Sequence, residues 1–200
     1  MSPATRRERL LDAAFRVIAR GGVPAATTRA ICAEAGMPLA SFHYVFESQQ
    51  EFMRELVERV IADAGDSQRF PVLTEDIYRN VELMLLSTFE WAVEHPDEDL
   101  AYYELLNYAL RTPGMEDFGQ RRLELSLELI VRAFQILDAI HENQITVADV
   151  RDLAWLVLTF IEGNAVMHLH TKETETIRRA IHTFAILIVD FARGRNGDRV

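Results

Sequence analysis

The residues best suited to chemistry are polar and aromatic side chains in one short segment, TTRAICAEAGMPLASFHYVF, which covers residues 27–46. The pattern predicts two short helices joined by a tight turn. Thr27 suits the N-cap of the first helix, because its hydroxyl can accept a hydrogen bond from a free backbone N–H. Gly36 suits the end of that helix, because glycine readily adopts a positive φ. Pro38 suits the first turn of the second helix, which is predicted to run from Pro38 to about Tyr44.

The second helix is predicted to present a polar, aromatic surface. Phe42 and Phe46 share one face and are expected to pack inward. The remaining side chains are free to meet base edges, because a recognition helix lies in the major groove of DNA. A helical corner with a solvated tip is the alternative. The predicted DNA-binding residues come from both helices: Thr27, Thr28, Arg29, Pro38, Leu39, Ser41, His43 and Tyr44.

The stretch from about Arg6 to Met53 resembles the DNA-binding domain of the TetR family of transcriptional regulators. RRERLLDAAFRVIARGG is similar to the first helix of that domain, TTRAICAEAG to the second, and SFHYVFESQQEF to the recognition helix and the start of a long fourth helix. The resemblance implies an all-α fold of about nine helices. Residues 1–47 would form a three-helix helix-turn-helix DNA-binding domain, and residues 48–200 a helical ligand-binding and dimerisation domain.

The chain departs from the family pattern inside the DNA-binding segment. Pro38 replaces the usual small hydroxyl residue, Ala40 the usual glycine and Val45 the frequent histidine. Gln49 replaces a lysine that often lies near phosphate at the start of the fourth helix. We expect this last change to give a shallower salt dependence of DNA binding, or to be compensated by an arginine elsewhere.

Charge is unevenly distributed along the chain. The net charge is −10, yet residues 1–46 carry six arginines against three acidic residues, a net of +3, so the remainder carries −13. A basic end on an acidic body would direct only that end toward phosphate. Ordinary scatter of charge is the alternative.

Beyond residue 47 the apolar residues recur at three- and four-residue spacing, which predicts helices and no strands. The predicted helices span residues 48–64, 75–94, 97–111, 116–139, 146–170 and 174–192. The last two helices are apolar on more faces than packing within one lobe requires. A homodimer joined by a four-helix bundle would bury the surplus, and a core within one chain is the alternative. The predicted interface residues are Val157, Phe160, Asn164, Ile177, Ile181, Phe184 and Ile188.

The family resemblance implies a regulatory lobe that binds a small molecule, so polar groups within apolar faces are candidate ligand contacts. Tyr103 and Asn107 share one helical face, and Trp155, Thr159 and Glu162 share another. The Glu162 carboxylate could pair with a cationic or hydrogen-bonding ligand, or with Arg111 or Arg132. The alternative is that the aromatic residues are large core side chains with satisfied polar tips.

Several other classes of protein do not fit the sequence. There is no Gly-rich phosphate loop, nucleophile elbow or paired-cysteine metal motif, so we expect neither an enzyme, nor a cofactor, nor a metal site. His168 and His170 point to opposite sides of a helix and are expected to be solvated or capping residues. Cys32 is the only cysteine, and residues 153–161 are too short an apolar stretch to span a bilayer. A cytoplasmic protein is expected.

The expected function is therefore that of a ligand-responsive DNA-binding transcriptional regulator. In the family it resembles, such a protein is usually a repressor that binds a pseudo-palindromic operator as a homodimer and is released by a small-molecule effector. A helical ligand-carrier or protein-interaction module with a degenerate DNA-binding head is the alternative, and the departures at Pro38, Val45 and Gln49 favour it.

Overall fold

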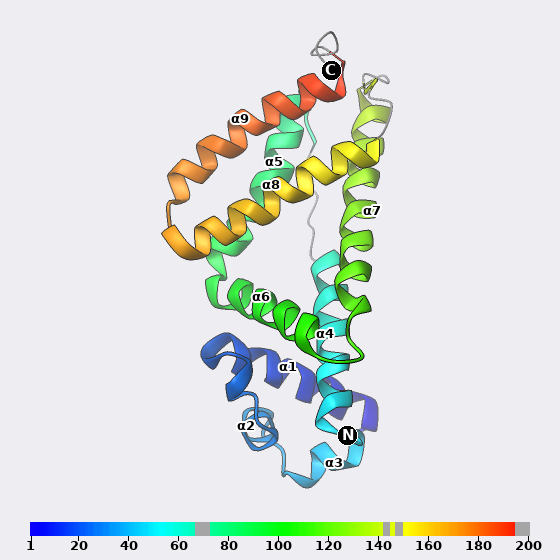
Figure 1. Cartoon of the computed structure of the whole chain (residues 1–200), viewed down its shortest axis with the longest axis vertical. Coiled ribbons are helices and arrows are strands. Elements are labelled where there is room, and N and C mark those ends of the chain that lie inside the picture. Colours follow the sequence, from blue (N-terminus) through cyan, green and yellow to red (C-terminus); the bar gives the residue numbers. More distant parts are fainter. Residues whose placement is uncertain (67–72, 142–144, 147–149, 195–200) are drawn as a thin grey trace. The chain divides into compact units, whose positions relative to one another are not determined.

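The computed structural model describes residues 1–66, 73–141, 145–146 and 150–194. These residues form nine α-helices and one short 3-10 helix, and no strand occurs among them (Figure 1). The predicted all-α fold is confirmed. The helices are α1 (Pro3–Gly21), η1 (Val23–Ala25), α2 (Thr28–Glu34), α3 (Ala40–Val45), α4 (Gln49–Asp66), α5 (Ile77–Glu94), α6 (Pro96–Arg111), α7 (Asp117–Ile140), α8 (Val150–Thr171) and α9 (Thr174–Ala192).

The helix bounds lie within a few residues of the predicted ones. The largest difference is at the start of α8, where a helix from residue 146 was predicted. The Thr146 backbone N–H instead donates to the Ala192 carbonyl at 2.8 Å, so Thr146 belongs to a loop held against the end of α9. The predicted start also covers residues 147–149, which lie outside the described residues. None of the described helices is both long and apolar enough to cross a membrane.

The chain divides into two compact units. The first contains α1 to α4, α6 and the start of α7, and the second contains α5, the rest of α7, α8 and α9. Helix α6 joins the first unit because it packs against α1 and α4. The division predicted at residue 47 separates a DNA-binding domain from a regulatory domain by function. The two compact units do not test it, so it stays a prediction.

The core of the first unit fixes the positions of α1, α3 and α4. Helix α1 is amphipathic and buries the face that carries Leu10, Ala14 and Ile18. Phe42 and Phe46 turn inward as predicted and meet Phe52 of α4, with ring centroids 4.8 to 5.3 Å apart. Burying large aromatic side chains is strongly stabilising, so this cluster holds the short helix α3 in one orientation.

The core of the second unit corrects part of the predicted dimer interface. Val157, Ile177, Ile181 and Ile188 are at most 5% exposed and lie in an apolar cluster with side chains of α5 and α7. Helices α8 and α9 both pack against α5, so these four residues face the core of their own chain. Their prediction as interface residues is wrong. An apolar stripe indicates that a helix face is buried, but it does not show whether the same chain or a second copy covers that face.

The other three predicted interface residues lie at the border of this core. The rings of Phe160 and Phe184 are half-buried and stacked, with centroids 3.8 Å apart and planes 6° apart. The Asn164 side-chain amide donates to the Phe160 carbonyl of its own helix at 2.7 Å. Their place in an interface between chains stays a prediction.

Candidate nucleic-acid interface

The start and the end of α2 are built as the sequence predicts. The Thr27 hydroxyl accepts a hydrogen bond from the Ala30 backbone N–H at 3.2 Å, so Thr27 is the N-cap. Gly36 follows the helix with φ of 65°. A side chain at Gly36 would meet no atom within 4 Å, so the backbone conformation and not lack of space accounts for glycine there. The Met37 N–H then donates to the Cys32 carbonyl at 2.8 Å and closes the turn.

Helix α3 begins two residues later than predicted. The Ser41 N–H donates to the Pro38 carbonyl at 2.8 Å and the Phe42 N–H to the Leu39 carbonyl at 3.1 Å. These bonds join residues three apart, which is the tighter spacing of a 3-10 turn. Pro38 and Leu39 therefore form a turn that leads into the α-helix at Ala40, and the predicted helix start at Pro38 is wrong.

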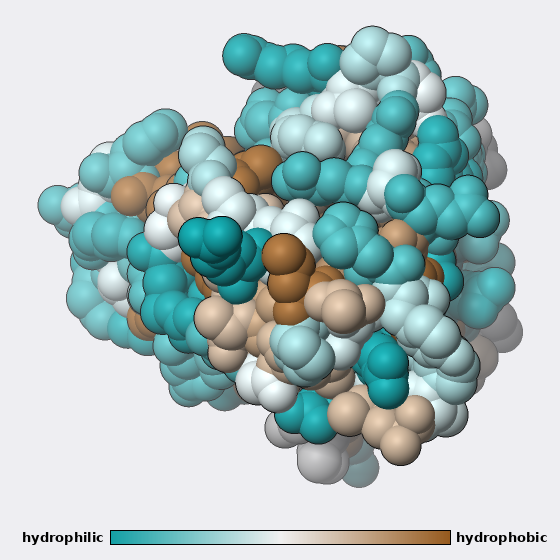
Figure 2. Space-filling model, turned by 90° about the horizontal axis from the view of Figure 1, so that it is seen from below, coloured by the Kyte–Doolittle hydropathy of each residue, from teal (hydrophilic) through white to brown (hydrophobic). Residues whose placement is uncertain are grey.

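The exposed side chains of this region define the candidate DNA-facing surface. Tyr44 is 67% exposed and Leu39 45% exposed, and Pro38 and His43 are exposed beside them. Figure 2, which is seen from below the view of Figure 1, shows a mainly hydrophilic surface with a small group of apolar side chains within it. The start of α2 adds three residues to this surface. The N-cap Thr27 and the first-turn residue Arg29 are exposed, and Thr28 is half-buried.

Ser41 does not belong to this exposed surface. Its side chain is 7% exposed, and it shares the buried face of α3 with Phe42 and Val45. That face packs against α1. The expectation that Ser41 points outward is therefore wrong, because α3 packs against α2 as well as α1 and its buried strip is wider than the two phenylalanines suggested.

Ion pairs hold the helices behind this surface in register. Arg7 of α1 binds Glu55 of α4 at 2.7 Å, also pairs with Glu51, and donates to the Val45 carbonyl at 2.7 Å. One guanidinium thus ties α1 to α4 and to the last residue of α3. Because all of its contacts are to groups far apart in the sequence, periodicity could not have identified Arg7 as the residue that joins these helices.

A second cluster of ion pairs joins α1 to α2. Arg16 and Arg20 both pair with Glu34, the former at 2.8 Å. Hydrogen bonds from these two guanidinium groups hold the pKa of Glu34 below its usual value. Arg29 differs from them: within the described part of the chain it has no ion pair and no side-chain hydrogen bond. Its charge is therefore available to an anion from outside.

Comparison with known proteins agrees with this geometry. Residues 10–56 match the family described as bacterial regulatory proteins, tetR family. The chain is 29% identical over 170 residues to the HTH-type nicotine-responsive transcriptional repressor HdnoR of Paenarthrobacter nicotinovorans, and the match covers 84% of this chain and 86% of that protein. The chain is therefore similar to TetR-family regulators, over residues 10–56 in the family match and over most of its length in the match to HdnoR.

Solved structures support the fold of this chain over nearly its whole length. A transcriptional regulator from Rhodococcus sp. Rha1 superposes with a TM-score of 0.75 at 17% identity, covering 96% of this chain and 98% of that one. A TetR transcription regulator from Haloarcula marismortui superposes with a TM-score of 0.71 at 20% identity, covering 94% and 98%. The expected architecture of a helix-turn-helix region followed by a helical domain is thus present.

The predicted ligand contacts fall in both units. Tyr103 and Asn107 lie on α6 in the first unit, where the Asn107 amide donates to the Tyr103 carbonyl at 2.9 Å. Trp155, Thr159 and Glu162 lie on α8 in the second unit. The role of all five in ligand binding stays a prediction.

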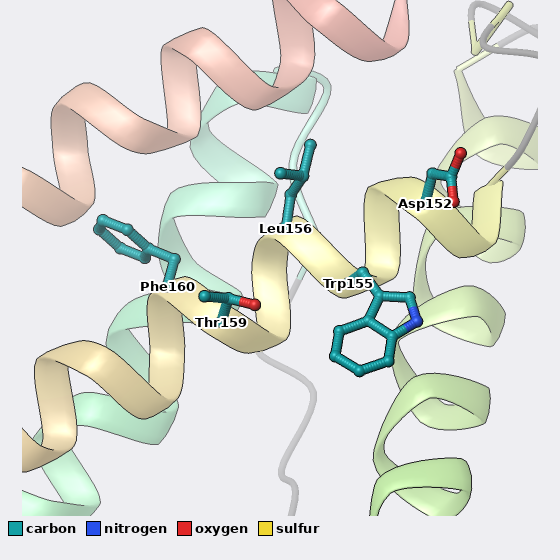
Figure 3. A pocket seen from close by; sticks show the side chains of 5 residues that line it. All are labelled: Asp152, Trp155, Leu156, Thr159 and Phe160. Atoms are coloured by element: carbon teal, nitrogen blue, oxygen red, sulfur yellow. The ribbon is translucent and has the colours of Figure 1, made fainter.

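A surface groove runs along α8 and contains two of these residues. It is lined by Asp152, Trp155, Leu156, Thr159 and Phe160, and Glu162 is not part of its wall. Figure 3 shows the five side chains following one another along α8, with Trp155 and Leu156 pointing to opposite edges of the helix. Trp155 is 46% exposed. It is therefore not the core residue that the alternative interpretation proposed.

His168 is a buried residue that the sequence did not identify. It was expected to be a solvated or capping residue, but it is 4% exposed, and its ring meets Phe89 edge-on with centroids 5.3 Å apart. No partner for its Nδ1 is found in the described structure. Burial, together with the positive charges of Lys172 and Arg178, lowers the pKa of His168. His170 is exposed as expected.

Proposed function

We propose that this chain is a transcriptional repressor that binds a pseudo-palindromic DNA operator as a homodimer and is released by a small-molecule effector. One observation carries the proposal: α3 is held from behind by a buried aromatic cluster while Leu39, His43 and Tyr44 remain exposed on its outer side. A recognition helix needs this combination of a fixed backbone and accessible polar tips. Exposed Arg29 on α2 adds a cation where the preceding helix crosses the phosphate backbone.

The regulatory part of the proposal is supported by a relative. HdnoR is described as a nicotine-responsive transcriptional repressor, and its likeness to this chain extends well beyond the helix-turn-helix region. For this chain we propose repression relieved by a small molecule. Such a molecule changes operator affinity only to the extent that it binds the two states of the regulator with different affinity.

The dimer is supported by apolar side chains on the outer faces of α8 and α9. Each helix buries one face against α5 and leaves the other uncovered. Large apolar side chains on these outer faces are 36% to 56% exposed, and such concentrations mark interaction surfaces. We define this outer apolar face by Leu156, Val166, Met167, Ile186, Leu187 and Phe191.

Gly163 lies in the middle of α8, and a side chain added there would meet no atom within 4 Å. Glycine inside a helix costs up to about 1 kcal/mol relative to alanine, and packing within this chain does not require it. Close approach of a second backbone would account for it. We therefore propose that two copies of α8 and α9 form a four-helix bundle through the outer apolar face.

The proposed effector contacts are Tyr103, Asn107, Trp155, Thr159 and Glu162. On α6, Tyr103 and Asn107 supply an aromatic ring and an amide. On α8, Trp155, Thr159 and Glu162 supply an indole, a hydroxyl and a carboxylate. Each set contains the kinds of group that small-molecule sites use. Trp155 and Thr159 already line a groove.

The test is to measure operator binding after removal of the DNA-facing groups. Tyr44→Ala and Arg29→Ala should each weaken binding to an operator duplex by tenfold or more, because each removes a proposed contact without disturbing the buried face of α3. Arg179→Ala is the matched control, since Arg179 is an exposed arginine on α9 in the second unit. If both head variants bind DNA as tightly as the control, a degenerate head becomes the better interpretation.

A further inference from the structure

The arginines of α1 and α2 differ in how their charges are used. Six arginines lie within residues 1–46. Arg7, Arg16 and Arg20 are neutralised by glutamates, and Arg9 donates to the Ala35 carbonyl at 3.0 Å. The other two are Arg29, already among the proposed DNA contacts, and Arg6. Neither has an ion pair within the described part of the chain.

Arg6 lies against the exposed aromatic residue of the recognition helix. Its guanidinium carbon is 5.0 Å from the centroid of the Tyr44 ring. Attraction between a cation and an aromatic face favours this position of the guanidinium. The ring accepts no charge, so the full positive charge and the N–H donors of Arg6 remain for an anion.

The backbone that carries Arg6 is ordered as well. Ser2 caps α1, because its hydroxyl accepts from the Thr5 N–H at 3.1 Å, and the Arg6 N–H donates to the Ser2 carbonyl at 3.1 Å. Arg6 thus projects from a capped helical turn. Its position beside Tyr44 is set from both its backbone and its side chain, which reduces the ordering cost of binding.

We propose that Arg6, held against Tyr44, is a contact to a DNA backbone phosphate at the border of the recognition helix. The inference rests on the proposed function. It also assigns the compensating arginine that the replacement of lysine by Gln49 led us to expect. A guanidinium presents paired N–H donors that match phosphate oxygens, and such a contact fixes the protein on the duplex without reading sequence.

A phosphate contact has a measurable signature. Each contact to duplex DNA contributes about −0.9 to the slope of log K against log salt concentration. Loss of Arg6 should therefore make the slope shallower by about 1 per subunit, and it should weaken binding to operator and to unrelated duplex by the same factor.

The experiment measures fluorescence anisotropy of a labelled operator duplex and a scrambled duplex with the full-length protein at four salt concentrations. Arg6→Ala should show the shallower slope and the uniform loss, and Arg6→Lys should restore the wild-type slope because it keeps the charge. Arg16→Ala is the control: it removes the same charge from the same helix, but from a residue already paired with Glu34. Circular dichroism verifies that each variant is folded.

Three results would overturn the inference. Arg6→Ala could keep the wild-type slope, or Arg16→Ala could change the slope equally, which would attribute the effect to net charge alone. Arg6→Ala could also lose affinity for the operator only, which would make Arg6 a base-reading residue. These results differ from failure of the proposed function, in which the folded wild-type protein would bind neither duplex.

Discussion

Thr27 shows how one residue can serve both folding and recognition. Its hydroxyl caps α2, and its exposed position places it among the predicted DNA contacts. Thr27→Ala should lower the free energy of unfolding by about 1 kcal/mol, because the Ala30 N–H loses its acceptor. Urea denaturation would measure this change.

Thr27→Ser is the control for that experiment, because serine keeps the capping hydroxyl and removes only a methyl group. It should retain wild-type stability. Equal unfolding free energies for Thr27→Ala and the wild type would contradict the role of Thr27 as a cap.

His168 predicts a pH dependence of stability. Its pKa in the folded protein lies below the usual value of about 6.5, so between the two values the unfolded chain binds more protons than the folded one. The free energy of unfolding should therefore rise with pH through this window and fall as the solution is acidified below about pH 6.5. Arg178 and Lys172 oppose protonation, and Glu90 favours it.

The measurement is urea denaturation of wild type and His168→Phe between pH 7.5 and about 5.5, a range that leaves most carboxylates ionised. The variant removes the titrating ring and keeps an aromatic side chain beside Phe89, so its stability should change less with pH. Identical pH profiles for the two proteins would show that His168 does not couple protonation to folding.

At the scale of residues, the sequence predicted those features that depend on local backbone chemistry. Three features are of this kind: the capping role of Thr27, the positive φ of Gly36 and the inward orientation of the two phenylalanines. Ser41 and His168 were misjudged because their burial depends on helices distant in the sequence. A helix of six residues, such as α3, has too few turns for its pattern to show how wide its buried face is.

At the scale of elements, the outer apolar face of α8 and α9 leads to a testable prediction about the dimer. Leu187 is 56% exposed on α9, so Leu187→Arg should leave the fold of the chain intact and place a charge in the proposed interface. Unpaired charge there is costly. Sedimentation or light scattering should show a shift toward monomer, and operator affinity should fall by more than tenfold.

The matched control is Leu110→Arg, because Leu110 is a leucine on α6 that is at least as exposed, at 66%, and lies outside the outer apolar face. Gly163→Leu adds an independent test, since the chain itself has open space there and leucine favours helix more than glycine does. It should weaken the dimer without lowering the stability of the monomer. A stable dimer in both Leu187→Arg and Gly163→Leu would contradict the proposed interface.

The dimer also shows what helical periodicity can and cannot predict. The sequence correctly located α8 and α9 and indicated that they are apolar on more than one face. It then assigned Val157 and Ile181 to the interface, whereas these residues face α5 and the outer apolar face carries Leu156 and Leu187. Core and interface are made from the same kinds of side chain, so only the packing of α5 against both helices distinguishes them.

At the scale of the whole molecule, the proposed function requires two heads to act together. One α3 of six residues makes few base contacts, and a two-fold axis doubles them and demands a symmetric site. Charge favours the same orientation, since residues 1–46 carry a net +3 within a chain of net −10. Among these arginines, Arg6, Arg9 and Arg29 have no carboxylate partner within the described structure, and Arg9 instead donates to the Ala35 carbonyl.

The most direct test of this account is an in vitro selection of random double-stranded DNA with the purified protein at near-physiological salt. We predict enrichment of a pseudo-palindrome whose half-sites lie about one helical turn apart, and we predict that Tyr44→Ala abolishes the enrichment. Failure of the folded, dimeric wild-type protein to enrich any sequence would contradict the central claim that this chain reads DNA through α3.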